Sequence, residues 1–239
     1  MIAKRYLVVN ADDFGQSEGI NQGIMQAYEN GIVTSCSLMV RHTAAADAAA
    51  YAREHRDLSA GLHIDLGEWT WHEGAWAPVY TVISSEDYSA VEEEIHRQLE
   101  VFRTIVGRQP THIDSHQHVH RNEPVRSIVT DVARILGVPL RNHSRVRYCG
   151  SFYGQGAVGE PLLDGITAEA LLRILATLPE GITELGCHPG TGNDLDSMYV
   201  HEREQELAVL CDPCIRQAIA SESIVLCSFH DIADSIKRG

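Results

Sequence analysis

Short apolar runs, bounded by polar residues, alternate along the chain with longer segments in which apolar residues recur at helical spacing. A short apolar run with polar borders is typical of a strand that is buried on both faces of a parallel sheet. Such runs predict strands at residues 6–10, 34–40, 58–63, 111–114, 138–141, 183–187 and 224–228.

The segments between most of these runs have the pattern of amphipathic helices. Ser17 stands where the N-cap of the first helix is expected, and Asn30 and Gly31 supply its stop signal. Further helices are predicted at residues 43–55, 88–106, 123–136, 167–178 and 201–220. Strands that alternate with helices indicate parallel βαβ units. We therefore predict an α/β fold: one domain over residues 1–239, forming a seven-stranded (β/α) barrel that is distorted or incompletely closed.

Two segments show neither the pattern of a strand nor that of a helix. The third predicted strand is followed by a long loop that holds Trp69, Trp71, His72 and Trp76. Residues 142–165 contain five glycines, and we interpret them as a functional loop or an insertion, because long structureless segments are uncommon in compact domains.

Composition narrows the function classes. With 44% hydrophobic and 22% charged residues, the chain of 239 residues has the make-up of a soluble globular protein. The net charge of -14 argues against a nucleic-acid partner, which needs clustered Lys and Arg, and against an anionic membrane surface. The apolar run near the N-terminus is too short for a signal-peptide core or a membrane span. We expect a cytoplasmic protein with no membrane insertion.

The six cysteines are scattered along the chain, which suits reduced thiols. Cys211 and Cys214 have the spacing of a redox motif, but they fall inside a predicted helix and no second pair accompanies them. We interpret this pair as structural.

The segment from Thr111 to His120 is the densest concentration of polar chemistry in the chain. In an extended backbone, alternation would place five of its side chains on one side: His112, Asp114, His116, His118 and His120. Imidazole and carboxylate are ligands of zinc and its neighbours, and carboxylate also suits magnesium or manganese. A solvated histidine-rich loop is the alternative. Because the cluster follows a predicted strand, we favour half of a metal site.

Other predicted strands end in similar groups. Asp12 and Asp13 follow the first strand, His63 ends the third, His188 follows the sixth and His230 follows the seventh. In α/β barrels, the C-terminal ends of the strands meet at one mouth. Three protein ligands around a metal ion with an open position fit hydrolysis, with a carboxylate to take the proton from water.

The adjacent aspartates cannot point the same way in an extended backbone. One of Asp12 and Asp13 could therefore bind a metal ion while the other acts as a base. The alternative is that the pair supplies negative charge to the N-terminus of the following helix.

Five sequence blocks carry a family resemblance: Val9–Gly15, Asn30–Ser35, Gly61–His63, Pro110–His120 and Cys187–Pro189. Together they resemble the YdjC family of carbohydrate deacetylases. The resemblance implies a (β/α) barrel related to the NodB-type polysaccharide deacetylases. It also implies that a divalent metal ion assists hydrolysis of the N-acetyl group of a small N-acetylated saccharide, releasing acetate.

The resemblance also implies roles for individual residues. Asp13, His63 and His116 match the metal ligands, Asp12 matches the base, and His188 protonates the departing amine or binds the oxyanion. The assignment of the two aspartates is left open. Residues expected to orient the ligands or contact the substrate are Asp114, His118, Asp65, Trp69, Trp71 and His230. His120 is as well explained by a structural role.

Two features depart from the family pattern or leave alternatives open. Asp65 stands where a small polar or apolar residue is expected, so it is expected to alter metal preference or substrate contacts. Trp69, Trp71 and Trp76 offer aromatic faces on which sugar rings stack, or they pack under the loop or at a dimer interface.

The expected cofactor is one divalent ion, magnesium or zinc first, then cobalt, nickel or manganese. The resemblance leads us to expect a homodimer. Two rival functions remain. A metal-dependent hydrolase of another amide or ester would need anion clamps if its substrate were a phosphoester, and only Arg121 and Arg141 lie near the motifs. A non-catalytic sugar- or metal-binding barrel is the other rival.

Overall fold

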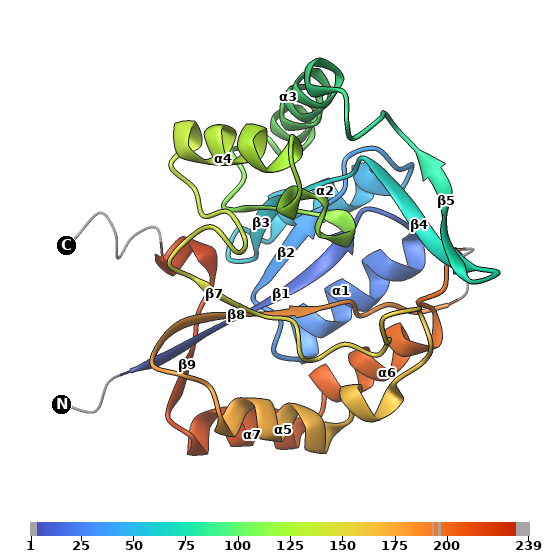
Figure 1. Ribbon diagram of the computed structural model, residues 1–239. Coiled ribbons are helices and arrows are strands. Elements are labelled where there is room, and N and C mark those ends of the chain that lie inside the picture. Colours follow the sequence, from blue (N-terminus) through green and yellow to red (C-terminus); the bar gives the residue numbers. More distant parts are fainter. Residues whose placement is uncertain (1–3, 193, 196, 233–239) are drawn as a thin grey trace.

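The computed structural model describes residues 4–192, 194–195 and 197–232 (Figure 1). Strand β1 (Arg5–Phe14) lies in the middle of the main sheet, and all of its neighbours run parallel to it. One side of β1 pairs with β8 (Gly181–Cys187). On the other side, β9 (Ile224–Leu226) pairs with the first half of β1, and β2 (Ser35–Leu38) pairs with the second half.

The sheet continues outward to two edges, in the order β6-β3-β2-β1-β8-β7. The added strands are β3 (Ser59–Ile64), β6 (Ile113–Ser115) and β7 (Arg147–Cys149). Within the described residues, no pairing joins β6 to β7, so this parallel sheet curls without closing. The predicted α/β fold with a distorted, incompletely closed barrel is confirmed.

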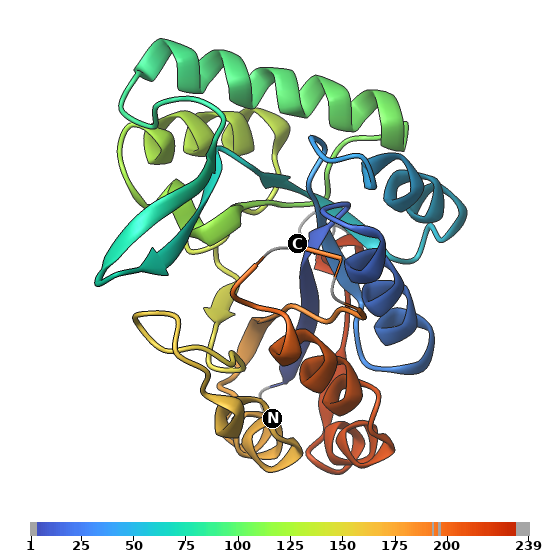
Figure 2. The ribbon, with the colours of Figure 1, turned by 90° about the vertical axis from the view of Figure 1, so that its right-hand side faces the viewer.

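The helices lie around the outside of the curled sheet (Figure 2). Apolar side chains on their inner faces and on the strands form one large core cluster. The α-helices are α1 (Glu18–Asn30), α2 (Ala45–Glu54), α3 (Tyr88–Val106), α4 (Val125–Leu136), α5 (Ala168–Ala176), α6 (His201–Leu210) and α7 (Pro213–Ser221). Ser17 caps α1 as predicted, because its side chain accepts a hydrogen bond from the Ile20 N–H. None of the described helices is both long and apolar enough to cross a bilayer.

Two predicted segments were assigned wrongly in the second half of the sheet. Residues 138–141 form only one isolated bridge, between Leu140 and Ile113, because Pro139 has no N–H to extend a ladder. The strand beside β8 comes instead from the glycine-containing segment 142–165, as β7. That segment also contains the short 3₁₀ helix η2 (Leu163–Ile166).

The segment predicted as a long loop after the third strand is a β-hairpin. Strands β4 (Gly67–His72) and β5 (Ala75–Thr81) pair antiparallel and form a second, two-stranded sheet. The two turn residues, Glu73 and Gly74, both have positive φ, at 49° and 86°. Two left-handed residues make the turn type that matches the twist of a two-residue hairpin. The Glu-Gly pair is a weaker sequence signal for this turn than Asn-Gly.

The histidine-rich segment does not stay extended. Strand β6 ends at Ser115, and the chain enters the 3₁₀ helix η1 (His116–Arg121). Gln117 and His118 inside it have φ of 47° and 54°. The predicted alternation through His120 is therefore wrong beyond Ser115.

The predicted helix 201–220 is two helices. Asp212 caps α7 by accepting a hydrogen bond from the Cys214 N–H, and Pro213 occupies the first turn. Cys211 and Cys214 flank this break, and both are free thiols. Burial raises the pKa of the Cys211 thiol, which disfavours a reactive thiolate and agrees with the structural interpretation.

Helix α1 packs closely against the chain that follows β8. A Cβ placed on Gly23 would lie 2.4 Å from the Cα of Gly190, so the two backbones touch where no side chain fits. Gly190 lies two residues after His188, and this contact therefore helps to place His188.

We expect Gly23→Ala to lower the free energy of unfolding by about 1–3 kcal/mol through overpacking. Alanine is favoured over glycine in a helix interior by ~1 kcal/mol, so a loss of stability reports the packing clash. Gln26→Ala, at an exposed position of the same helix, is the matched control and should change stability little. Urea unfolding of both variants checks this, and a more stable Gly23→Ala protein would contradict it.

Candidate active site

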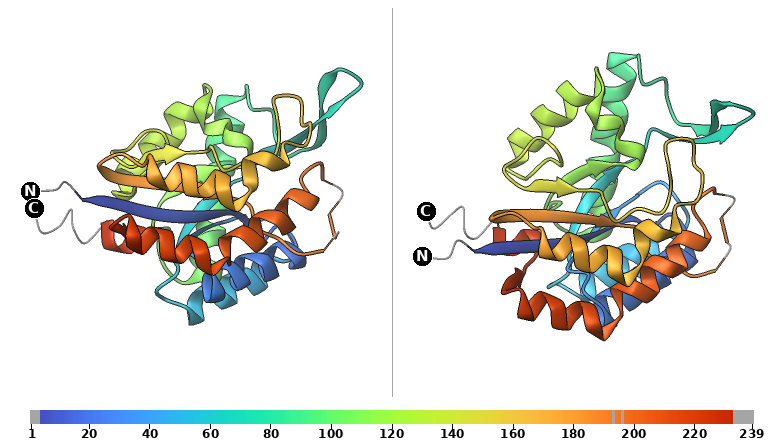
Figure 3. Two further views of the ribbon diagram at one scale, coloured as in Figure 1. Left: turned by 90° about the horizontal axis from the view of Figure 1, so that it is seen from below. Right: turned by 60° about the horizontal axis from the view of Figure 1, so that its bottom comes forward.

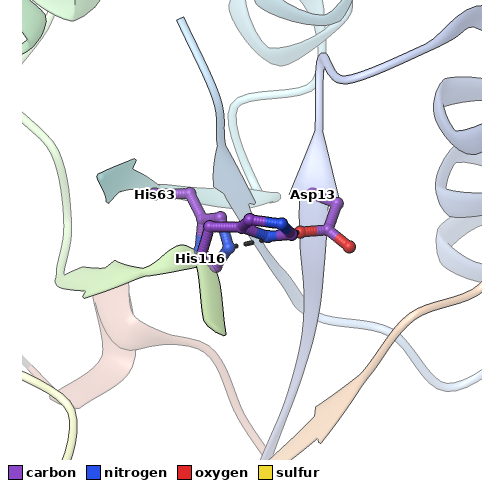
Figure 4. Close-up of side chains that lie close together, drawn as sticks. All are labelled: Asp13, His63 and His116. Carbon is purple, nitrogen blue, oxygen red and sulfur yellow. Dashed lines mark hydrogen bonds and ion pairs between the residues drawn. The ribbon is translucent and has the colours of Figure 1, made fainter. Parts of the chain in front are cut away.

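Asp13, His63 and His116 meet at the C-terminal ends of β1, β3 and β6 (Figure 4). Oδ1 of Asp13 lies 3.2 Å from Nε2 of His63 and 3.0 Å from Nδ1 of His116. One ligand atom from each residue lies within 4.8 Å of the others. The sequence prediction that these three side chains converge is confirmed.

A bulge in β1 turns Asp13 toward the histidines. The register with β2 shifts between Ala11 and Phe14, and Asp13 has φ of 67°. A bulge places an extra residue opposite the partner strand and re-aims its side chain. Two adjacent aspartates thereby reach two different sets of partners.

The second oxygen of Asp13 is held by an arginine. Nη2 of Arg203, on α6, donates a hydrogen bond of 2.7 Å to Oδ2 of Asp13. Burial raises the pKa of Asp13, but the charges of Arg203 and His116 outweigh it and hold the pKa well below its ordinary value. Asp13 is therefore ionised, and its Oδ1 faces the two imidazoles.

Both ring nitrogens of His63 face carboxylates. Nδ1 lies 2.7 Å from Oδ1 of Asp114, and Nε2 faces Asp13. Burial lowers the pKa of His63, but the charge of Asp114 and the hydrogen bonds to both carboxylates raise it to about 10. A ring set between two carboxylates needs a positive charge at this position, which a proton or a metal cation supplies.

This arrangement fits a divalent cation. One carboxylate oxygen and two imidazole nitrogens surround a single buried point, which is the three-ligand set of catalytic zinc and related sites. Asp114 behind His63 fixes the ring orientation, as carboxylates do behind metal-binding histidines. The opposite nitrogen of His116, Nε2, is buried and has no hydrogen-bond partner among the described residues.

Asp12 also lies close to His63, with ligand atoms of the two residues within 4.8 Å of each other, and its carboxylate is held by an arginine. Arg141 donates hydrogen bonds of 2.6 Å and 2.8 Å to the two oxygens of Asp12, and Nδ2 of Asn10 donates one of 2.8 Å. Burial raises the pKa of Asp12, but the Arg141 charge offsets it, so the pKa lies below its ordinary value. Asp12 is therefore an ionised, oriented carboxylate.

His188, which follows β8, lies near Asp12. Its Nε2 is 3.8 Å from Oδ2 of Asp12, and its Nδ1 is 3.8 Å from Oε1 of Glu206. Its backbone N–H also donates a hydrogen bond of 2.5 Å to Glu206. Burial lowers the pKa of His188, but Glu206 and Asp12 raise it above its ordinary value. The raised pKa favours the protonated form of His188.

These groups lie in a cavity of about 820 Å³. Asp12, Asp13, His63, His116 and His188 all line it, together with side chains that could contact a ligand. Those side chains include Trp69, Trp76, His118, Tyr148 and Tyr153. A cavity of this size that combines aromatic faces with a few converging polar groups is typical of a small-molecule site.

Asp65 and His230 do not line the cavity, so their predicted contact with substrate is corrected. Asp65 instead accepts a hydrogen bond of 3.0 Å from the Tyr80 hydroxyl and one of 3.0 Å from the Gly67 N–H, so it holds the start of the hairpin. His230 lies in the segment that follows β9, where the N–H of Phe229 donates a hydrogen bond to Ser59, the first residue of β3. That segment therefore lies at the opposite end of the sheet.

The contacts of Trp71 and His120 bear on their predicted roles, whereas the predicted role of His118 stays a prediction. Trp71 does not line the cavity itself but packs edge-on against Trp76, with ring centroids 5.6 Å apart. His120 is buried, and its Nδ1 lies 2.6 Å from Oγ of Ser115, so it closes the turn after β6. This contact supports a structural role for His120. His118 lines the cavity, and its contact with substrate stays a prediction.

Sequence reasoning missed several charged groups of the site. Arg203 and Glu206 lie three residues apart on one face of α6, and Glu68 begins the hairpin. A charged residue in an amphipathic helix indicates a solvated surface, so no sequence signal marked Arg203 or Glu206. Arg141 lay near the motifs, but its contacts with buried carboxylates depend on the fold.

Comparisons with known proteins agree with the site. The family model described as YdjC-like protein matches residues 6–221. A chitooligosaccharide deacetylase from Serratia marcescens is 33% identical over 260 residues, covering 96% of this chain and 100% of the relative. A carbohydrate deacetylase from Geobacillus stearothermophilus is 32% identical, covering 95% of this chain and 98% of the relative.

Solved structures support the same fold. A crystal structure from Enterococcus faecalis V583 matches with a TM-score of 0.80 and 25% identity, covering 96% of this chain and 99% of that one. A family 4 carbohydrate esterase from Streptomyces lividans, solved with acetate, matches with a TM-score of 0.57 at 16% identity over 95% of this chain and 92% of its own, which shows the fold alone. The resemblance carried by the five sequence blocks is confirmed, and the chain belongs to the YdjC-like protein family.

Proposed function

We propose that this protein is a metal-dependent carbohydrate deacetylase. It hydrolyses the acetamide of a small N-acetylated saccharide and releases acetate and a free amine. The observation that carries the proposal is the meeting of Asp13, His63 and His116 beside Asp12 and His188 in one cavity. The deacetylase relatives, which match this chain almost from end to end, support the same reaction class.

Asp13, His63 and His116 are the residues that would hold one divalent ion. When bound there, such an ion supplies polarisation of the acetamide carbonyl and a lower pKa for water. The Asp-His-His set suits magnesium or zinc, and also cobalt, nickel or manganese.

The geometry supports different roles for the adjacent aspartates in this proposal. Asp13 shares Oδ1 with both imidazoles, so it is the ligand. Asp12 is ionised and oriented by Arg141, so it is the base that takes a proton from the attacking water. Arg141 also limits rotation of the Asp12 carboxylate during this transfer.

His188 completes the proton transfers. Glu206 and Asp12 raise the pKa of His188, which favours its protonated form, and its Nε2 lies 3.8 Å from Oδ2 of Asp12 in the same cavity. As the carbon–nitrogen bond of the acetamide breaks, His188 donates its proton to the departing nitrogen. The water oxygen remains on the carbonyl carbon, so the products are acetate and an amine.

Asp12 and Asp13 can be separated by experiment. We expect Asp12→Asn to lower kcat for acetate release by about 10²–10⁴-fold, the usual contribution of a general base, while metal affinity is retained. Asp13→Asn should weaken metal affinity as well, because it removes a ligand. Acetate assays together with equilibrium dialysis of the metal ion check this. The roles would have to be exchanged if Asp12→Asn lost the ion and Asp13→Asn retained it.

Removal of the metal should stop the reaction. We expect chelator to abolish acetate release from N-acetylglucosamine oligomers and added Zn²⁺ or Mg²⁺ to restore it. His63→Ala should weaken ion affinity by more than about 100-fold, whereas His96→Ala, at an exposed position of α3, should leave it unchanged. Undiminished release after chelation would refute the metal dependence. Ion binding with no release from any acetylated saccharide would favour another substrate or a binding protein.

The pH dependence should report His188. Because its pKa is raised and its protonated form is the acid, kcat should fall as the pH rises through that pKa. Glu206→Gln removes a charge that raises this pKa, so the alkaline limb should move to lower pH. Glu204→Gln, at an exposed position of the same helix, is the control. An unchanged profile in a folded Glu206→Gln protein would rule out His188 as the acid.

We further propose a cytoplasmic homodimer, in keeping with the resemblance. Light scattering of the purified protein measures the oligomeric state directly.

A further inference from the structure

The β4–β5 hairpin projects from the main sheet (Figures 1 and 3). Trp69 and Trp71 alternate along β4, so they share one face, and Trp76 pairs directly opposite Trp71. Trp69 and Trp76 line the cavity. The hairpin therefore turns an aromatic face toward the site.

The side chain of Gln117 joins this hairpin to the segment that carries His116. Oε1 of Gln117 accepts a hydrogen bond of 2.9 Å from the Trp69 N–H, and Nε2 of Gln117 donates one of 2.8 Å to the Trp69 carbonyl. The amide thereby satisfies both backbone groups of Trp69, as a neighbouring strand would. Gln117 is the residue next to His116.

A second contact runs beside this one. Oε2 of Glu68, adjacent to Trp69, lies 3.8 Å from Nε2 of His116 and accepts a hydrogen bond of 3.2 Å from Gln16. Two consecutive residues of the hairpin thus face two consecutive residues of η1. The hairpin and the turn that carries His116 are positioned together.

The turn itself is strained. Gln117 and His118 both have left-handed φ, which is costly for residues that carry a side chain. Such conformations persist only where the surroundings hold them, and they cluster at functional sites. Here the left-handed turn directs the Gln117 amide toward the hairpin, and the two hydrogen bonds to Trp69 hold it there.

The two ends of the cavity differ in depth. Asp13 and His63 are 2% and 1% exposed, whereas Trp76 is 47% exposed. An acetamide that reaches the buried residues leaves the rest of a longer saccharide near the rim, where the tryptophans lie. Indole faces stack well on the apolar faces of sugar rings.

We propose that Gln117 is a positioning residue that fixes the tryptophan face of the hairpin over the cavity, and that this face selects N-acetylated saccharides longer than one sugar. The proposal rests on the proposed deacetylase function. Gln117 itself lines the cavity, and its side-chain amide is bonded to the backbone of Trp69, through which it acts on the tryptophan face.

The kinetic test compares one sugar with two. For Gln117→Ala, KM for the dimer of N-acetylglucosamine should rise by about tenfold, the loss expected from two exposed hydrogen bonds. KM for the monosaccharide should rise less than KM for the dimer, because a single sugar does not reach the tryptophan face. Gln117→Glu keeps the acceptor for the Trp69 N–H but loses the donor, so an intermediate effect is expected. His72→Ala, at an exposed position of the hairpin, is the control.

Hydrogen exchange tests the clamp independently of activity. Residues 67–81 should exchange faster in Gln117→Ala than in the wild type, while α3 and the main sheet stay protected. Unchanged exchange in the hairpin, or an equal rise of KM for both sugars, would overturn the proposal. A wild-type protein that releases no acetate from either sugar would overturn the deacetylase function, and the exchange result would still decide whether Gln117 holds the hairpin.

Discussion

The site depends on the balance of charge around Arg141. Its guanidinium contacts three buried carboxylates, at 2.6 Å from Asp12, 2.7 Å from Asp114 and 2.6 Å from Glu184. Like charges cannot stay ionised side by side in a poorly solvated interior without such a counter-ion. Burial raises the pKa of Glu184 to about 7 even with Arg141 beside it, which shows how closely negative charge is packed here. The ionised state of these carboxylates therefore depends on the charge of Arg141.

Each of the two adjacent aspartates is likewise neutralised by an arginine of its own. Arg141 holds Asp12 on one side of β1, and Arg203 holds Asp13 on the other. The bulge in β1 allows both arrangements within two residues, because it breaks the regular alternation of the strand. The proposed base and the proposed metal ligand thereby lie next to each other without sharing a counter-ion. The neutralising residues come from distant segments, so the separation is a property of the fold.

The β4–β5 hairpin lies outside the main sheet and contributes side chains to the site. It belongs to neither edge of the main sheet, and it reaches the site through Glu68 and Trp69. A two-stranded ribbon has little core of its own and is marginally stable when isolated. Its position over the cavity therefore depends on contacts with the rest of the fold, among them Gln117 with Trp69, Asp65 with Tyr80 and Met198 with Trp71. Such an element is suited to recognise the part of a substrate that lies away from the reacting bond.

The sequence by itself determined the parallel α/β class, most helices, the family and the convergence of Asp13, His63 and His116. Those features follow from local periodicity and from the rule that parallel strands end at one rim. Only the tertiary structure decided the partners of these groups, because Arg203 and Glu206 approach them from a helix about 190 residues away from Asp13. It also decided that β7 replaces the segment ending at Arg141, since strand pairing depends on neighbours that the local sequence does not contain. Local pattern thus identified which side chains converge, and long-range packing decided their charged partners and orientations.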